Sequence, residues 1–249
     1  TYPETLHSPV IVAFLVCVVV AMLFGAFNGI LVAFFKIQPM IATLILYTAG
    51  RSIAAWINNN ELPVINEPSF AYYGTYIPGI PIPTPFFIMV ICVVIIALLL
   101  KFTNLRLYTE AVGINESSSR LNGLNPAFIK VMSFVVLGIC VAVVGLIKVS
   151  RFSTINYSVI AKDIEMDAIL AVALGGNALS GGKFNMVASI IGAYVIQFLI
   201  TTLYRFNVQS DALPAYKAVV IIIRVIVSAP SVKEWFSRFT KKLMKKEVA

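Results

Sequence analysis

The sequence predicts an all-α membrane protein, a polytopic bundle of transmembrane helices, on three observations. Hydrophobic residues make up 59% of the 249 residues and charged residues 12%, and the mean hydropathy of +0.92 lies far outside the range of soluble domains. Several apolar stretches reach about 20 residues, the length that a helix needs to cross about 30 Å of hydrocarbon. Short polar segments separate these stretches. We therefore expect one transmembrane domain over residues 1–249.

The long apolar stretches locate the expected spans along the chain. The stretch 85–100 reads PFFIMVICVVIIALLL without a polar side chain. Asn125 is well placed as an N-cap, with Pro126 in the first turn of the helix that follows. The expected spans are 9–35, 38–57, 85–100, 126–147, 184–204 and 213–229.

A short apolar piece interrupts this pattern near 166–183. Residues 166–174 are too few to cross alone, and the sequence GGNALSGGK follows them. We expect a broken or short helix there, which is tolerated where protein or water covers its free backbone groups. Such segments often line a transport pathway.

Basic residues in the loops predict the orientation. The segment 101–130 carries four of them and 58–84 carries none; the four are Lys101, Arg106, Arg120 and Lys130. We therefore expect 101–125 to be cytoplasmic and 58–84 external. The tail 230–249 alternates lysines with apolar residues at helical spacing, which predicts a cytoplasmic amphipathic helix on the lipid surface. Both placements require an even number of crossings after residue 125, so we favour a crossing by 166–174 completed by flanking residues.

The net charge of +8 is explained by this lipid-facing tail and not by nucleic acid. The chain starts at Thr1 without a signal-peptide pattern, and we expect further helices upstream.

Small residues at four-residue spacing predict close helix packing. Gly25 and Gly29 form a GxxxG face, and Ala188 with Gly192 repeats the spacing. The partner of each face is either another helix of this chain or a second copy of the protein.

Ionisable residues inside apolar spans are costly and therefore informative. Arg51 either orients its span, pairs with an acid or lines a pathway. Lys217 is expected to snorkel to the outer surface, and Arg224 fits the inner one. Glu165 and Asp167 precede the short apolar piece, where carboxylates suit both hydrogen bonding to a polyol and anchoring a helix start.

Enzyme chemistry has little support in this chain. The single histidine is His7, and no acidic or Cys/His metal constellation appears. GGNALSGGKF fails the phosphate-loop pattern at Asn177 and Phe184. We therefore expect no ATP site and no cofactor in the chain. Any energy for its activity has to come from an ion gradient or from a partner protein.

The cytoplasmic segment contains a short polar helix from about Glu116 to Leu121, bounded by Gly113 and Gly123, whose apolar exposure is expected to be slight. The segment AVGINESSSRLNGL resembles the A-x-G-x-N-x-x-A-A-x-x-x-G loop of permeases in the ribose, xylose and galactofuranose ABC import family. Segments 36–51, 165–185 and 217–223 also resemble this family. The sequence of 36–51, KIQPMIATLILYTAGR, is most similar to that of the galactofuranose-type permease.

This resemblance implies a permease that works in the bacterial inner membrane with a second permease copy or paralogue. It further implies cytoplasmic ATPase subunits, which use ATP and Mg, and a periplasmic protein that delivers a galactofuranose-like or ribose-like sugar. The mechanism that it implies is alternating access, in which the ATPases drive the permease between an outward-open and an inward-open state. The ATPase-coupling residues that it implies are Gly113, Asn115, Glu116, Arg120 and Gly123. The pathway candidates are Arg51, Glu165, Asp167, Gly175, Gly176, Gly181 and Gly182.

The chain departs from the family pattern at two places. Ser117 and Ser118 replace paired alanines, and 161–164, which reads AKDI, replaces G-x-G-Y. The family's G-G-I-D-L-S-V-G segment is absent. The rival classes are an ion-coupled secondary transporter using Asp167 or Glu165, and a membrane scaffold without solute flux.

Overall fold

The computed structural model describes residues 10–65, 68–76, 79, 81–157, 159–178, 181–182, 184–209, 212–213 and 215–220. The chain divides into two compact units, 1–162 and 163–249. Every named element in the described residues is a helix, and five helices are long and apolar enough to span a membrane. The predicted all-α polytopic class is therefore confirmed.

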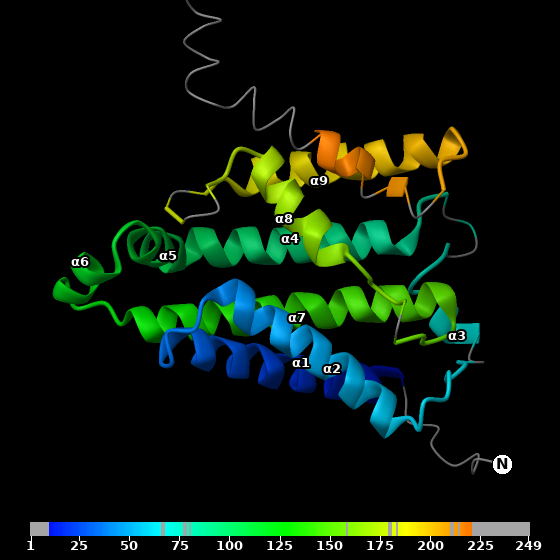
Figure 1. The fold of residues 1–249 in the computed structure, drawn as a ribbon, viewed down its shortest axis with the longest axis horizontal. Coiled ribbons are helices and arrows are strands. Elements are labelled where there is room, and N and C mark those ends of the chain that lie inside the picture. The colour runs from blue at the N-terminus through cyan, green and yellow to red at the C-terminus, as the bar shows by residue number, and fades with distance from the viewer. Residues whose placement is uncertain are drawn as a thin grey trace, which may run out of the picture. The chain divides into compact units, whose positions relative to one another are not determined.

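Unit 1 contains four of these long helices and three short ones (Figure 1). The long helices are α1 (Val10–Ala33), α2 (Pro39–Ile57), α4 (Thr84–Phe102) and α7 (Pro126–Phe152). The short ones are α3 (Pro68–Ala71), α5 (Leu105–Ile114) and α6 (Glu116–Leu121). Helix α7 extends five residues beyond its predicted end, and α5 was not expected.

Glycines bring α1 and α7 into close antiparallel contact. A Cβ atom on Gly29 would lie 2.7 Å from the Val131 Cα, and one on Gly138 would lie 2.5 Å from the Ala21 carbonyl oxygen. Gly25 faces the Phe134 carbonyl in the same way. The GxxxG face therefore packs within the chain, which resolves the alternative that its spacing left open.

The two ends of unit 1 are built differently. At one end, the segment after α2 pairs with the segment after α7: the Ile65 N–H donates to Ser153 at 2.8 Å and the Ile155 N–H donates to Pro63 at 3.1 Å. Helix α3 lies at this end, and Ser150 of α7 donates to the carbonyl of Phe70. Helices α5 and α6 lie at the opposite end (Figure 1).

Unit 2 contains the predicted short helix, α8 (Ile164–Leu174), and the long α9 (Met186–Arg205). The eleven residues of α8 rise about 16 Å, about half the hydrocarbon depth. The described residues on either side of α8 add no further helical turn before α9. A crossing completed by the flanking residues stays a prediction.

Helices α8 and α9 form a tight antiparallel pair. A Cβ on Gly175 would lie 2.5 Å from the Ala188 carbonyl oxygen, and Gly192 faces the Ala171 carbonyl. The Ala188 and Gly192 spacing is thus also satisfied within the chain.

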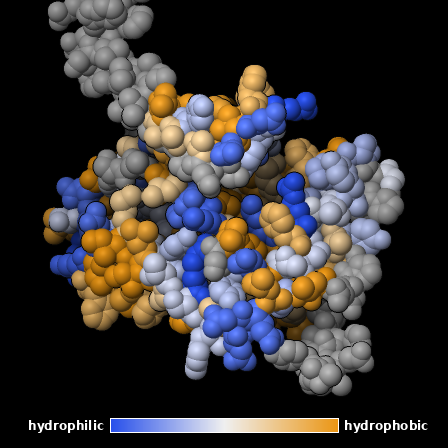
Figure 2. All heavy atoms as spheres, turned by 45° about the vertical axis from the view of Figure 1, so that its right-hand side comes forward, coloured by the Kyte–Doolittle hydropathy of each residue, from blue (hydrophilic) through white to orange (hydrophobic). Residues whose placement is uncertain are grey.

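The surface, and not the interior, carries most of the large apolar side chains. Figure 2 shows apolar side chains gathered in patches on the face that it draws. Fully buried apolar residues in the described part are few, and exposed ones extend along α1, α4 and α9. Lipid is the solvent that such a surface fits.

Some predicted features lie outside the described residues. They are His7, Arg224, most of the span 213–229 and the tail 230–249. Of the last span, residues 215–220 are described and helical.

Candidate functional site

The predicted coupling residues form a capped helix at one end of unit 1. The Asn115 side chain accepts a hydrogen bond from the Ser118 N–H at 3.0 Å and caps the start of α6. The Gly123 N–H donates to Arg120 and the Leu124 N–H donates to Ser119, both at 3.1 Å. These two bonds close α6 with a Schellman motif, which requires the left-handed φ of +80° at Gly123. Asn115 and Gly123 therefore fix both ends of α6.

Helix α6 is tied to a long helix by charge. Lys130 of α7 donates to the Glu116 carboxylate at 2.6 Å, with side chains 30% and 54% exposed. The Ser119 hydroxyl, which is buried, donates to the Asn115 carbonyl at 2.9 Å. The N-cap of α7 is the predicted Asn125, which accepts from the Phe128 N–H at 3.2 Å.

Leu121 is the residue at this site that the sequence analysis missed. It is 90% exposed, so the expectation of slight apolar exposure on this helix is wrong. Leu121 is the sole apolar residue in ESSSRL and stands directly before the closing Asn122 and Gly123. That isolated position in a polar helix was the available signal.

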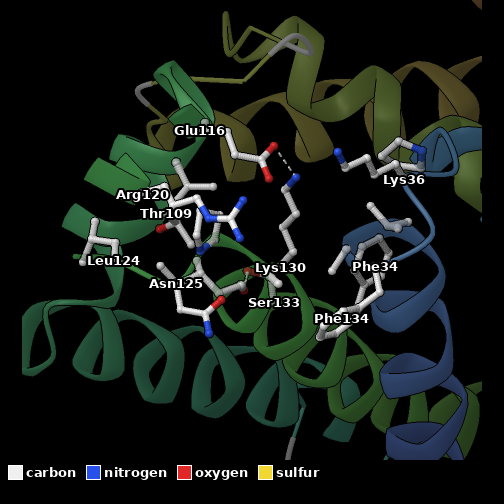
Figure 3. A pocket seen from close by; sticks show the side chains of 18 of the residues that line it. Phe34, Lys36, Thr109, Glu116, Arg120, Leu124, Asn125, Lys130, Ser133 and Phe134 are labelled. Atoms are coloured by element: carbon white, nitrogen blue, oxygen red, sulfur yellow. Dashed lines mark hydrogen bonds and ion pairs between the residues drawn. The ribbon is translucent and has the colours of Figure 1, made fainter. Parts of the chain in front are cut away.

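A cavity of 1370 Å³ lies beside α6, between the α1–α2 turn and the first turns of α7 (Figure 3). Gly113, Glu116 and Arg120 line it, whereas Asn115 and Gly123 do not. The structure thus places three of the five coupling residues on one cavity and gives the other two a capping role.

Arg51 holds a loop and makes no ion pair among the described residues. Its guanidinium donates to the carbonyls of Tyr157 and, at 3.1 Å, Ile160, and lies 4.5 Å from the ring centroid of Tyr47. Its Nε is buried without a described partner. Of the roles expected for Arg51, the geometry fits the orientation of α2 against residues 153–162.

Asp167 of α8 is paired with Lys217. The Lys217 ammonium lies 2.5 Å from the Asp167 carboxylate, on side chains 16% and 26% exposed. The expectation that Lys217 snorkels to the surface is therefore wrong. Glu165, two residues before Asp167, is half-buried.

The glycine-rich loop after α8 is organised by Asn177. Its side-chain oxygen accepts from the Asn185 N–H at 2.6 Å, and its amide donates to the Ser189 hydroxyl at 2.7 Å. Asn185 then caps α9 by accepting from the Ala188 N–H. Gly176, Gly181 and Gly182 all have positive φ in this loop. Asn177 therefore closes a turn that reverses the chain between α8 and α9.

The departure at 161–164 falls on strained backbone. Ala161 and Asp163 have φ of +55° and +62°, the left-handed region that costs a non-glycine residue about 1–2 kcal/mol. These are the two positions at which the resembling pattern has glycine. The connector into α8 therefore keeps a glycine-like path without glycine.

The pathway candidates of unit 2 do not form one cluster. Glu165 and Asp167 begin α8, whereas Gly175 and Gly176 follow its end. Gly181 and Gly182 belong to the loop that Asn177 closes. Arg51 belongs to unit 1.

Residues 3–229 match a family described as "Branched-chain amino acid transport system / permease component". The chain belongs to this permease family. Among its relatives, a fructose import permease protein of Bifidobacterium longum is 35% identical over 233 residues, covering 92% of this chain and 65% of the relative. A galactofuranose transporter permease protein of Escherichia coli is 36% identical over 205 residues, covering 82% and 60%. A ribose import permease protein of Haemophilus influenzae is 34% identical over 233 residues, covering 89% and 69%.

These matches confirm the resemblance to sugar import permeases. The permease chain spans less than two thirds of the length of the first two relatives. No solved structure gives a significant match. The chain is therefore a multi-pass membrane protein of a permease family whose relatives are transport subunits.

Proposed function

We propose that the chain is part of the permease subunit of an ATP-binding-cassette importer that moves a monosaccharide across the bacterial inner membrane. The observation that carries this proposal is the set of relatives named for fructose, galactofuranose and ribose, which match 82% to 92% of the chain. The shared chemistry is a small uncharged polyol. Galactofuranose-like and ribose-like sugars remain the first candidates.

The proposed assembly contains partners that this chain does not supply. Two cytoplasmic ATPase subunits bind ATP and Mg, a periplasmic protein delivers the sugar, and a second permease copy or paralogue completes the membrane part. The permease contributes the path and its two alternating openings, and hydrolysis takes place on the ATPases.

Helix α6 is the proposed ATPase contact. Its capped ends and its ion pair to α7 make α6 rigid. A displacement of α6 by a partner would therefore be transmitted to α7, which is a membrane-length helix. Leu121 projects from this helix as an apolar side chain that suits a pocket on a partner. Arg120 adds charge beside it.

Helix α8 and the loop that follows are the proposed lining of the sugar path, with Glu165 and the loop glycines nearest the solute. The ion-coupled alternative is not favoured. Of its two candidate carboxylates, Asp167 is paired with Lys217, and the relatives named for sugar import give an ion-coupled mechanism no support.

The contact is tested by purifying the tagged full-length protein with its partners from native membranes. We expect Leu121→Ser to lower ATPase recovery about ten-fold, because one buried apolar anchor contributes about 1–2 kcal/mol. Val159→Ser is the matched control, since Val159 is 64% exposed and follows α7 at its other end. Unchanged recovery with Leu121→Ser, or an equal loss with Val159→Ser, would remove α6 from the interface.

The transport function is tested by uptake of radiolabelled fructose, ribose and galactofuranose in cells carrying the complete transporter. Uptake should persist with an uncoupler while ATP is maintained. Loss of sugar uptake under that condition would instead support the ion-coupled secondary transporter.

A further inference from the structure

The cavity beside α6 lies where three membrane-length helices end. Helix α1 ends at Ala33, α2 begins at Pro39 and α7 begins at Pro126, and each is long enough to cross the hydrocarbon. Their common end therefore lies at the level of the lipid headgroups. All described lining residues belong to unit 1.

Cationic side chains converge on this cavity. Figure 3 shows the amines of Lys36 and Lys130 and the guanidinium of Arg120 directed toward the same open space. Glu116 is the one acid among the described lining residues, and it is paired with Lys130. Lys36 and Arg120 remain without a carboxylate in the described lining, so the cavity suits an anion.

Lys36 occupies strained backbone at the cavity rim. Its φ is +54°, in the left-handed region that glycine or asparagine occupies at lower cost. This turn carries the Lys36 side chain, whose ammonium is directed to the cavity (Figure 3).

Apolar walls adjoin these cations. Val32, Ile37, Ile129 and Phe134 line the cavity, together with Phe34, which is 66% exposed. A free inorganic anion gains nothing from such walls. A molecule with a phosphate at one end and hydrocarbon at the other satisfies both parts.

We propose that this cavity binds an anionic phospholipid, with its phosphate held by Lys36, Arg120 and Lys130 and an acyl chain against Phe34 and Phe134. Ammonium and guanidinium groups both donate charge-assisted hydrogen bonds to phosphate oxygens. The bound lipid would join the α1–α2 turn to α6 and α7, and so add to the stiffness of this end of unit 1.

The test uses the full-length protein purified in mild detergent without ATPase or sugar, so its outcome is independent of the transport proposal. Native mass spectrometry measures the affinity for phosphatidylglycerol and for phosphatidylcholine with identical acyl chains. We expect a clear preference for phosphatidylglycerol. Lys36→Gly and Lys130→Gln should each lower that affinity about five-fold and leave phosphatidylcholine unchanged, because each cation near a lipid surface contributes about that factor. Lys36→Gly keeps the left-handed turn and so preserves the fold.

Lys101→Gln is the matched control, since Lys101 lies in the last turn of α4 at the same end and does not line the cavity. It should keep the full preference. An equal loss with Lys101→Gln, or no preference in the unmodified protein, would overturn the site. Displacement of the lipid by millimolar inorganic phosphate would also overturn it, because the occupant would then be a soluble anion.

Discussion

The Asp167 carboxylate and the Lys217 ammonium lie 2.5 Å apart in surroundings that leave them 26% and 16% exposed. Either charge alone is costly beside apolar helices, and the pair removes that cost. It also joins α8 to the described start of the last helical segment, 50 residues along the chain. A residue predicted to line the pathway and a lysine predicted to reach the surface thus form one ion pair.

Breaking this pair should reduce the stability of the protein. We expect Lys217→Met to destabilise by about 1–3 kcal/mol, below the value for a fully buried pair because both side chains retain some solvent access. Thermal unfolding of the full-length protein in detergent measures it. The exchange Asp167→Lys with Lys217→Asp should recover most of the loss. If the single variant melts normally, the pair contributes nothing to stability.

At the scale of elements, glycine positions control how closely helices approach. Gly138 faces the backbone of α1, whereas Gly145, two turns further along α7, has open space where a side chain would begin. Both glycines belong to α7, but only Gly138 has the backbone of another helix opposite its Cα atom.

These two glycines give a matched pair of substitutions. Gly138→Ala should lower stability by about 1–3 kcal/mol, because its Cβ would lie 2.5 Å from the Ala21 carbonyl and force α1 and α7 apart. Gly145→Ala should raise stability by about 0.5–1 kcal/mol through helix propensity. Thermal melts of both variants decide the matter. Equal shifts in the same direction would contradict the α1–α7 packing.

At the scale of the whole molecule, the segments that connect the membrane-length helices of unit 1 lie at two opposite ends. The α1–α2 turn, α5 and α6 lie at one end, and the segment after α2 pairs with the segment after α7 at the other. Lys36 lies at the first end together with the basic residues of 101–130, while Lys148 and Arg151 lie near the end of α7 at the second. The first end is the predicted cytoplasmic side.

This orientation is tested in a cysteine-free background of the full-length protein. An impermeant thiol reagent added outside spheroplasts should label Ile65→Cys and leave Leu121→Cys unlabelled. Leu121→Cys should react only after the membrane is opened. Labelling of the two positions in the reverse order would invert the topology.

The all-α membrane class, the start of α7 at Asn125 and Pro126, the short helix near 166–183 and the permease family could all be predicted from the sequence. Apolar runs of a given length and capping residues act within one segment of the chain, so helices and their ends can be predicted from them without knowledge of the fold. The five residues implied for coupling could also be named from the resemblance alone.

Which surfaces meet could not be predicted from the sequence and is known from the structure. It showed that the Gly25 and Gly29 face packs on α7, that Lys217 pairs with Asp167 and that Leu121 is exposed. It also gathered Lys36, Arg120 and Lys130 on one cavity. Each of these depends on groups distant in sequence, and in a chain that is apolar on most faces the hydrophobic pattern does not mark which face is buried.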